Sequence, residues 1–264
     1  MDKATIIGLI LALLALLLGM FFKHVPFGVL LNPAAFFIII VGTAAAVTIG
    51  FPGHELKRIP KLFGVLFKTK TSQTVSDLIP MFTDWANIAR KEGLLALEAK
   101  ITEIDDHFLK NGLSLAIDGQ SPEFIRDVMN EEIDAMEERH LAGAGIFTQA
   151  GTYAPTLGVL GAVVGLIAAL GNMADIDALG AAIAAAFVAT LLGIFTGYVL
   201  WHPFANKLKR KSKEEIHVKR VMIEGVLSVL DGQSPTMLEQ KLASYLPHFE
   251  REKYYASQGG KSDE

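Results

Sequence analysis

The chain contains no cysteine, which excludes disulfide bonds and thiolate metal sites. Its 24 basic and 28 acidic side chains leave a formal net charge of only −4. Composition therefore lacks the basic surplus that is typical of nucleic-acid-binding proteins. The 7 histidines are scattered without the spacing of metal ligands. We predict no metal site, no bound cofactor, no catalytic residue and no enzymatic activity.

A more informative absence concerns the long apolar runs. Apolar residues make up 51% of the chain, and the mean hydropathy is +0.38, above the usual value for a soluble domain. Crossing a bilayer core takes ~20 mostly apolar residues, and four runs are long enough: roughly 4–22, 29–51, 151–170 and 179–201. None carries Asp, Glu, Lys, Arg or His at mid-depth, where ion-coupled carriers place an ionisable residue. Either the protein moves no ions, or a partner supplies the carboxylate.

Basic residues near the ends of the apolar runs predict the orientation in the membrane. Two basic clusters follow the second and fourth runs: Lys57, Arg58, Lys61, Lys68 and Lys70, then Lys207, Lys209, Arg210, Lys211 and Lys213. The link between the first two runs holds only Lys23, and residues 172–178 hold no basic residue. We therefore predict that both termini and the long middle region are cytoplasmic.

These features predict an all-α membrane protein with four transmembrane helices and long helices extending into a cytoplasmic helical domain. The predicted parts are a transmembrane hairpin (1–51), a cytoplasmic helical domain (52–146), a second transmembrane hairpin (147–203) and a cytoplasmic helical tail (204–264). The first run also resembles a secretion signal. However, no small-residue cleavage pattern follows it, and a second run begins almost at once.

The middle region has the period of an amphipathic helix. From Val75 to Ile101, apolar residues recur at intervals of three and four. On one such helix, Arg90, Leu94 and Glu98 would share the same half, because they lie four residues apart. A solvated surface is the ordinary interpretation of this pair of charges.

One short motif with helix-ending and helix-starting residues occurs twice, as LSLAIDGQSP (113–122) and LSVLDGQSP (227–235). Glycine suits the left-handed end of a helix, serine caps the next helix, and proline suits its first turn. We predict a helix end followed by a helix start at both places. Beyond Pro122 the helical pattern runs almost without interruption into the third span, and beyond Pro203 the tail continues the fourth span.

Small residues mark the last two apolar runs. Gly158, Gly161 and Gly165 in the third run, and Gly193 and Gly197 in the fourth, are residues that let transmembrane helices approach closely. Ordinary helix packing is the simplest interpretation of these glycines.

Two prolines and one threonine are less easily explained by packing. Pro155 removes a helical hydrogen bond to the carbonyl of Gly151 and can bend the third span. Pro203, at the inner end of the fourth span, predicts a bend at the interface. Thr190 lies in the middle of the fourth span, at the predicted depth of Ala162. Its hydroxyl either bonds back to its own helix or faces a wet path and bonds a partner's carboxyl group.

Three segments resemble the motility protein A family, the larger stator subunits of the bacterial flagellar motor within the MotA/TolQ/ExbB proton channels. They are ARKEGLLALE (89–98), FTQAGTYAPTLGVLGAVVGLIAAL (147–170) and AAFVATLLGIFTGYVLWHPFANKLKRKSK (185–213). The similarity runs over essentially the whole chain, with the motifs in the family's order.

The resemblance implies an ion channel in the bacterial cytoplasmic membrane that does mechanical work. Five copies would surround two copies of motility protein B, whose transmembrane helix supplies the ion-carrying aspartate. The cytoplasmic insert would push on the rotor's switch-complex protein. The expected partners are thus motility protein B, the rotor, further copies of the chain and membrane lipid, with no nucleic acid.

Site residues follow from the resemblance residue by residue. Arg90 and Glu98 match the charged pair that faces the rotor. Pro155 and Pro203 match the prolines linked to torque-generating conformational change, and Thr190 matches the pore hydroxyl beside the partner's aspartate.

The ion pathway is expected to include four positions besides Thr190. We assign Pro155 and Tyr198 to it with Thr190, and also Ala162 and Ala189, where sodium-driven relatives tend to carry threonines. Because this chain lacks those threonines, we expect the transported ion to be the proton rather than sodium.

Three competing functions remain. An ExbB/TolQ-type energiser subunit of an outer-membrane transport system shares the inner pair of spans. It usually has three spans and lacks the hairpin of residues 4–51. A solute transporter would show a site at broken helices and symmetry between its halves. A passive scaffold would not leak protons when its partner is present.

Overall fold

The computed structural model describes residues 2–68, 73–171 and 176–259, and every regular element in these ranges is helical. Four helical stretches are long and apolar enough to span a membrane: Lys3–Phe22, Phe27–Gly50, and parts of Pro122–Leu170 and Ala178–Leu230. The predicted all-α fold with four transmembrane helices is confirmed. Backbone contacts divide the chain into a membrane unit, Met1–Thr69 with Arg139–Lys211, and a polar unit, Lys70–Glu138 with Ser212–Glu264.

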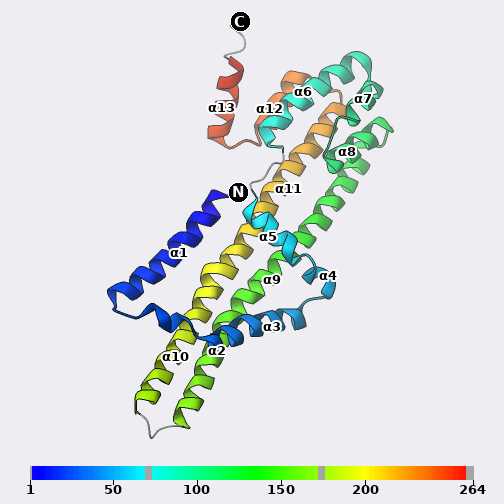
Figure 1. Ribbon diagram of the computed structural model, residues 1–264. Helices are drawn as coiled ribbons and strands as arrows, with labels where there is room; N and C mark the ends of the chain where they lie inside the picture. Colours follow the sequence, from blue (N-terminus) through cyan, green and yellow to red (C-terminus); the bar gives the residue numbers. More distant parts are fainter. Residues whose placement is uncertain (1, 69–72, 172–175, 260–264) are drawn as a thin grey trace. The chain divides into compact units, whose positions relative to one another are not determined.

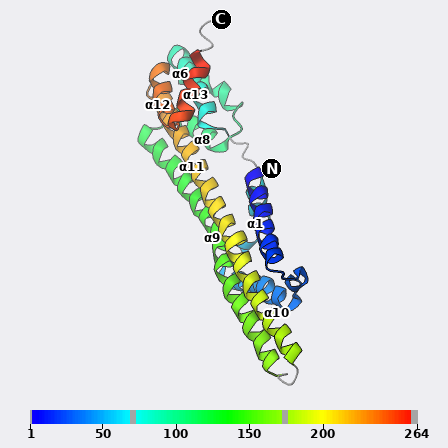
Figure 2. The ribbon, with the colours of Figure 1, turned by 90° about the vertical axis from the view of Figure 1, so that its left-hand side faces the viewer.

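The membrane unit is built around two helices that lie side by side, α9 and α10 (Figure 1, Figure 2). Its elements are α1 (Lys3–Phe22), α2 (Pro33–Phe36), α3 (Gly42–Gly50), α4 (Gly53–Leu56), α5 (Ile59–Phe67), the second part of α9 (Pro122–Leu170), α10 (Ile176–Phe195) and the start of α11 (His202–Leu230). The helices α9 and α11 continue from this unit into the polar unit, as the sequence predicted.

The second span is not one regular helix. It consists of a 3₁₀ turn (Phe27–Leu30), α2, a π-helical stretch (Phe37–Val41) and α3. Pro33 starts α2, and the Asn32 side chain caps it by accepting a hydrogen bond from the Ala35 backbone N at 3.1 Å. The Asn32 amide also donates to the Ala185 carbonyl O at 3.5 Å, which links this span to α10.

The polar unit has its own hydrophobic core. Its elements are α6 (Val75–Glu92), a 3₁₀ turn (Leu94–Leu97), α7 (Glu98–Ile101), α8 (His107–Ile117), the first part of α9, the rest of α11, α12 (Pro235–Ala243) and α13 (His248–Gly259). Phe82, Phe108 and Met129 are among its fully buried side chains. Gly225 lies directly under the Phe82 ring, where no Cβ would fit.

The two DGQSP corners are confirmed. Gly119 and Gly232 take positive φ angles of 75° and 68° just after α8 and α11 end. Ser121 accepts a hydrogen bond from the backbone N of Phe124 at 3.2 Å. Ser234 caps α12 in the same way, and prolines begin α9 and α12.

The predicted single helix from Val75 to Ile101 is wrong. Gly93 takes a φ of 88°, which ends α6 after Glu92. A 3₁₀ turn and the short α7 follow. Arg90 and Glu98 therefore do not share one helix face. The apolar spacing continued across the break because both segments bury side chains in the same core.

Glu224 joins three helices of the polar unit. Its carboxylate oxygens lie 2.7 Å from an Arg126 guanidinium nitrogen on α9 and 2.9 Å from Lys241 Nζ on α12. Burial raises the pKa of Glu224, but the hydrogen bonds and charges of Arg126 and Lys241 outweigh burial. The pKa of Glu224 therefore lies below its usual value of 4.5.

A group with a lowered pKa in the folded state adds stability above its unfolded pKa, and this stability is lost as the pH falls through the folded pKa. We expect Glu224→Gln to lower the free energy of unfolding by about 1–3 kcal/mol at pH 7. The difference from wild type should shrink as the pH falls below 4.5. Thermal unfolding of the purified chain, followed by the fluorescence of Trp85 in a Trp201→Phe background, measures it. Glu131→Gln, at an exposed site on α9, is the control, and equal effects of the two substitutions would contradict the assignment.

Candidate functional site

Glycines bring the backbones of α9 and α10 into direct contact. A Cβ added at Gly193 would lie 2.7 Å from the carbonyl O of Ala154 and 2.8 Å from the Cα of Gly158. A Cβ at Gly158 would lie 2.9 Å from the carbonyl O of Ala189. Because backbone atoms block these positions, no larger residue fits without moving a helix. The predicted close approach of the two helices is confirmed.

Pro155 packs into the same contact. A Cβ at Gly197 would lie 2.7 Å from the Pro155 ring and 2.8 Å from the carbonyl O of Gly151. That carbonyl is the one that Pro155 deprives of its helical hydrogen bond. It therefore faces the backbone of the neighbouring helix, and α9 remains helical through the proline.

The fourth span widens just before Pro203. Residues Thr196–Trp201 form a π-helical stretch between α10 and α11. Pro203 has no backbone N–H, so the carbonyl of Val199 cannot receive its usual helical bond. Isolated π turns of this kind often lie at functional sites in helices.

Thr190 and Tyr198 line one groove on the fourth span, formed by α10 and the π-helical stretch that follows it. The groove has a volume of about 430 Å³, and its other walls, including Phe187 and Ile194, are apolar. The Tyr198 side chain is 65% exposed. The Thr190 hydroxyl donates to the carbonyl O of Ala186 at 3.3 Å, and its oxygen retains acceptor capacity. The groove is thus uncharged, with two hydroxyl groups.

The two alanines assigned to the ion pathway lie elsewhere. Ala189 is 2% exposed and packs with Ala35, Ile39 and Ala154. Ala162 is half-buried on α9. The structure therefore brings Thr190 and Tyr198 together, and directs Ala189 towards the second span and α9.

Asp2 ties the start of α1 to α11. Its carboxylate caps α1 by accepting from the backbone N of Ala4 at 3.1 Å, and it forms an ion pair with Lys207. Its own backbone N donates to the carbonyl O of Phe67 at 2.9 Å. The hydrogen bond from Lys207 holds the pKa of the Asp2 carboxyl below its usual value, in spite of partial desolvation.

The charged pair of the polar unit lies on two elements. Arg90 lies in the last turn of α6, Glu98 begins α7, and both side chains are exposed. Neither forms an ion pair with any residue that the structure describes. Both charges are available to an external partner, although the sequence placed them on one helix.

His202 was missed by the sequence analysis. Its ring centroid lies 5.3 Å from that of Tyr198. A Cβ at Gly151 would lie 2.8 Å from the His202 ring, so the ring covers the backbone next to Pro155. Only its position immediately before Pro203 in the chain could have drawn attention to it. Across the described ranges, no group of three His, Asp or Glu side chains is placed to hold a metal ion.

Comparison with known proteins identifies relatives over nearly the full length. Residues 100–221 match the MotA/TolQ/ExbB proton channel family. The chain is 67% identical to motility protein A of Bacillus subtilis, over 98% of this chain and 96% of that protein. It is 33% identical to the chemotaxis protein PomA of Vibrio alginolyticus, over 93% and 96% of the two chains.

A solved structure agrees with these matches. The structure of the flagellar MotAB stator complex from Bacillus subtilis contains a chain with a TM-score of 0.92 and 67% identity, covering 96% of this chain and 99% of that chain. Four apolar helices and an uncharged, glycine-packed pair of inner spans define a membrane channel subunit. The chain belongs to the MotA/TolQ/ExbB proton channel family and, within it, to the motility protein A group.

The contact at Gly193 leads to a prediction. We expect Gly193→Ala to destabilise the membrane unit by about 1–3 kcal/mol, because the added methyl group meets the rigid backbone of Ala154. The amount of folded protein in membranes and its thermal stability in detergent measure the effect. Gly180→Ala on the same helix is the matched control, since a Cβ there has nothing within 4 Å. Equal stability of the two variants would contradict the tight contact.

Proposed function

We propose that the chain is a stator subunit of the bacterial flagellar motor. The observation that carries this proposal is the 67% identity to a motility protein A over 98% of the chain. The full-length relatives include the hairpin of residues 4–51, which the three-span energiser subunits lack. The proposed setting is the bacterial inner membrane, with both termini in the cytoplasm, because the basic clusters flank the inner ends of the second and fourth spans.

The proposed partner in ion conduction is motility protein B. The four spans carry no ionisable residue at mid-depth, so the partner's aspartate would take up the ion. Five copies of the chain would surround two copies of the partner. The groove of Thr190 and Tyr198 offers this aspartate an uncharged wall with hydroxyl groups, where protonation removes a charge that is costly in lipid.

The transported ion is proposed to be the proton. Ala162 and Ala189 add no oxygen ligands, and a partly dehydrated sodium ion needs several. The structure buries Ala189 between the second span and α9, so its side chain does not line the groove. The transmembrane hairpin of residues 147–203 would line the channel, and residues 52–146 and 204–264 would form the cytoplasmic part.

Coupling of ion flow to movement is proposed at the two prolines. Pro155 contacts Gly197, which lies within the π turn that precedes Pro203. A change on the groove side of α10 would therefore reach α9 and α11 through backbone contacts rather than through flexible side chains. Arg90 and Glu98, exposed on the polar unit, would transmit the resulting force to the rotor's switch-complex protein.

We expect a strain that lacks this chain to be non-motile, and to regain swimming and proton influx when the chain and its partner are restored. Thr190→Val should keep the complex assembled and reduce both proton influx and swimming speed, because the groove loses a polar group. Thr48→Val is the matched control: the Thr48 hydroxyl bonds the Ala44 carbonyl within its own helix and does not line the groove. Swimming that needs a sodium gradient would overturn the choice of proton. Restored proton influx without torque would support the channel function and contradict the stator function.

The rotor contact gives a separate prediction. Arg90→Glu should reduce torque under load, and a reversed charge on the rotor should restore it. Each exposed pair is worth only ~1 kcal/mol or less, so Arg90→Glu with Glu98→Lys should have a larger effect than either alone. Bead-rotation assays measure the torque. Lys253→Glu, on exposed α13, is the control, and failure of every rotor reversal to rescue would argue against direct contact.

A further inference from the structure

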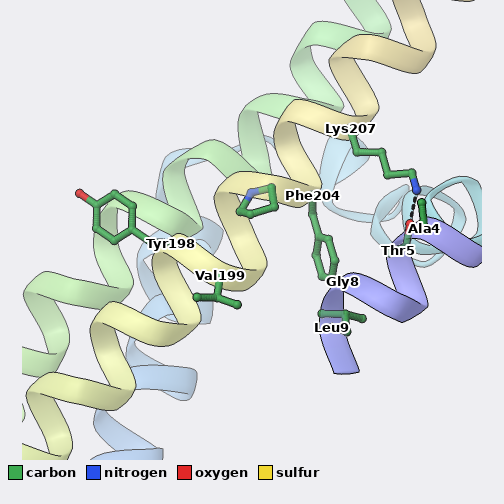
Figure 3. A pocket seen from close by; sticks show the side chains of 9 residues that line it. Ala4, Thr5, Gly8, Leu9, Tyr198, Val199, Phe204 and Lys207 are labelled. Carbon is green, nitrogen blue, oxygen red and sulfur yellow. Dashed lines mark hydrogen bonds between the residues drawn. The ribbon is translucent and has the colours of Figure 1, made fainter. Parts of the chain in front are cut away.

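A groove of about 480 Å³ lies between α1 and the junction of the fourth span with α11. Figure 3 shows its two sides: Gly8 and Leu9 on α1, facing Val199 and Phe204. Both sides belong to the membrane unit. The walls are almost entirely apolar, and the Phe204 side chain, which is 7% exposed, forms part of the floor.

The groove is open because α1 makes few contacts with the rest of the chain. Only 6% of the apolar window of α1 is buried within the chain. Leu11 and Phe22 are 60% and 74% exposed. A Cβ at Gly8, inside the groove, would have nothing within 4 Å. Tyr198 and Val199 also line the groove of Thr190, so the two grooves adjoin on the fourth span. On the α1 side, the open apolar groove lies beside an exposed helix and is accessible to lipid chains.

Positive charge gathers at one end of the groove. Lys207 reaches across from α11 to the Thr5 hydroxyl (Figure 3). It also forms an ion pair with Asp2. Lys211 Nζ lies 4.0 Å from the same Asp2 carboxylate, and Lys3 is exposed beside it. Two ammonium groups thus share one carboxylate, with a third nearby, so this end carries a net positive charge.

The depth of the charged end matches that of lipid headgroups. α1 begins at Lys3, and Lys207 lies about one helical turn beyond Pro203, where the fourth span ends. From there the groove runs along α1 as far as Leu9, towards the hydrocarbon core. Basic pockets between transmembrane helices at the cytoplasmic side are typical binding sites for anionic lipid headgroups.

We propose that this groove binds one anionic phospholipid, with an acyl chain along Gly8, Leu9 and Val199 and the headgroup phosphate at Lys207. The lipid completes the packing of α1 against the fourth span, next to the π turn. A phospholipid combines a straight apolar chain with a phosphate. The chain fits the apolar walls of the groove, and the phosphate fits the lysines at its end. A second copy of the chain could pack its apolar side chains into the groove, but it would also have to place an acidic side chain opposite the lysines.

The test uses the full complex with its partner, reconstituted in nanodiscs of equal phosphatidylglycerol and phosphatidylethanolamine and then extracted mildly. Retained lipid is quantified by mass spectrometry. Wild type should retain phosphatidylglycerol in preference, and Gly8→Leu should lower its retention because the side chain occupies the groove. Lys207→Gln should lower the preference by about fivefold, the loss of one lysine near a phosphate. Gly19→Leu, at an equally open position on α1, is the matched control.

The outcomes separate lipid from protein as the occupant. Equal lipid retention by the Gly8→Leu and Gly19→Leu variants, or no preference in wild type, would overturn the proposal. Since the chain has no cysteine, Gly8→Cys places a single thiol in the groove. Its labelling by a lipid-soluble maleimide should be slower in phosphatidylglycerol than in phosphatidylethanolamine. A thiol that resists labelling in every lipid, or disulfide linkage to a second copy, would show a protein occupant instead.

Discussion

Direct backbone contact between α9 and α10 at Gly158 and Gly193 fixes how the two inner spans of the membrane unit face each other. Since successive residues of a helix are rotated by about 100°, turning Gly193 and Gly197 towards α9 turns Tyr198 away from it. By the same rotation Thr190 lies between the glycine face and Tyr198, about 80° from Tyr198, so the groove that both residues line borders the glycine contact. The neighbouring contact at Gly197 also places the carbonyl of Gly151, which Pro155 deprives of its helical bond, against the backbone of the fourth span.

Much of this architecture could be predicted from the sequence because its signals are local. Apolar length predicts the spans, and glycine, serine and proline at fixed offsets predict the DGQSP corners. Gly93 was missed because an apolar period continued across it and concealed the break. The burial of Ala189 could not be predicted either, since it depends on how the irregular second span packs. The π turns leave no distinct pattern in the sequence, and the positions of Thr190 and Tyr198 on one groove required the fold.

The lack of charge in the spans has two physical effects. It leaves the groove of Thr190 and Tyr198 with hydroxyl groups as its only polar side-chain groups, so a helix that carries a carboxyl group meets no fixed counter-ion there. It also confines the ion pairs of the membrane unit to its polar edge, where Asp2 and Lys207 hold α1. The ion pair that holds α1 therefore lies at the polar end of this helix, and its contacts at the depth of the lipid chains are apolar.

The π turn at Thr196–Trp201 contains more residues per turn than the α-helix on either side of it. Restoring α geometry there would take up the excess of one residue, which corresponds to a rotation of about 100° between the segments before and after it. The same helix continues to Leu230. A local change of hydrogen-bond register would thus become a twist of α11 about its own axis, without any residue leaving the helix.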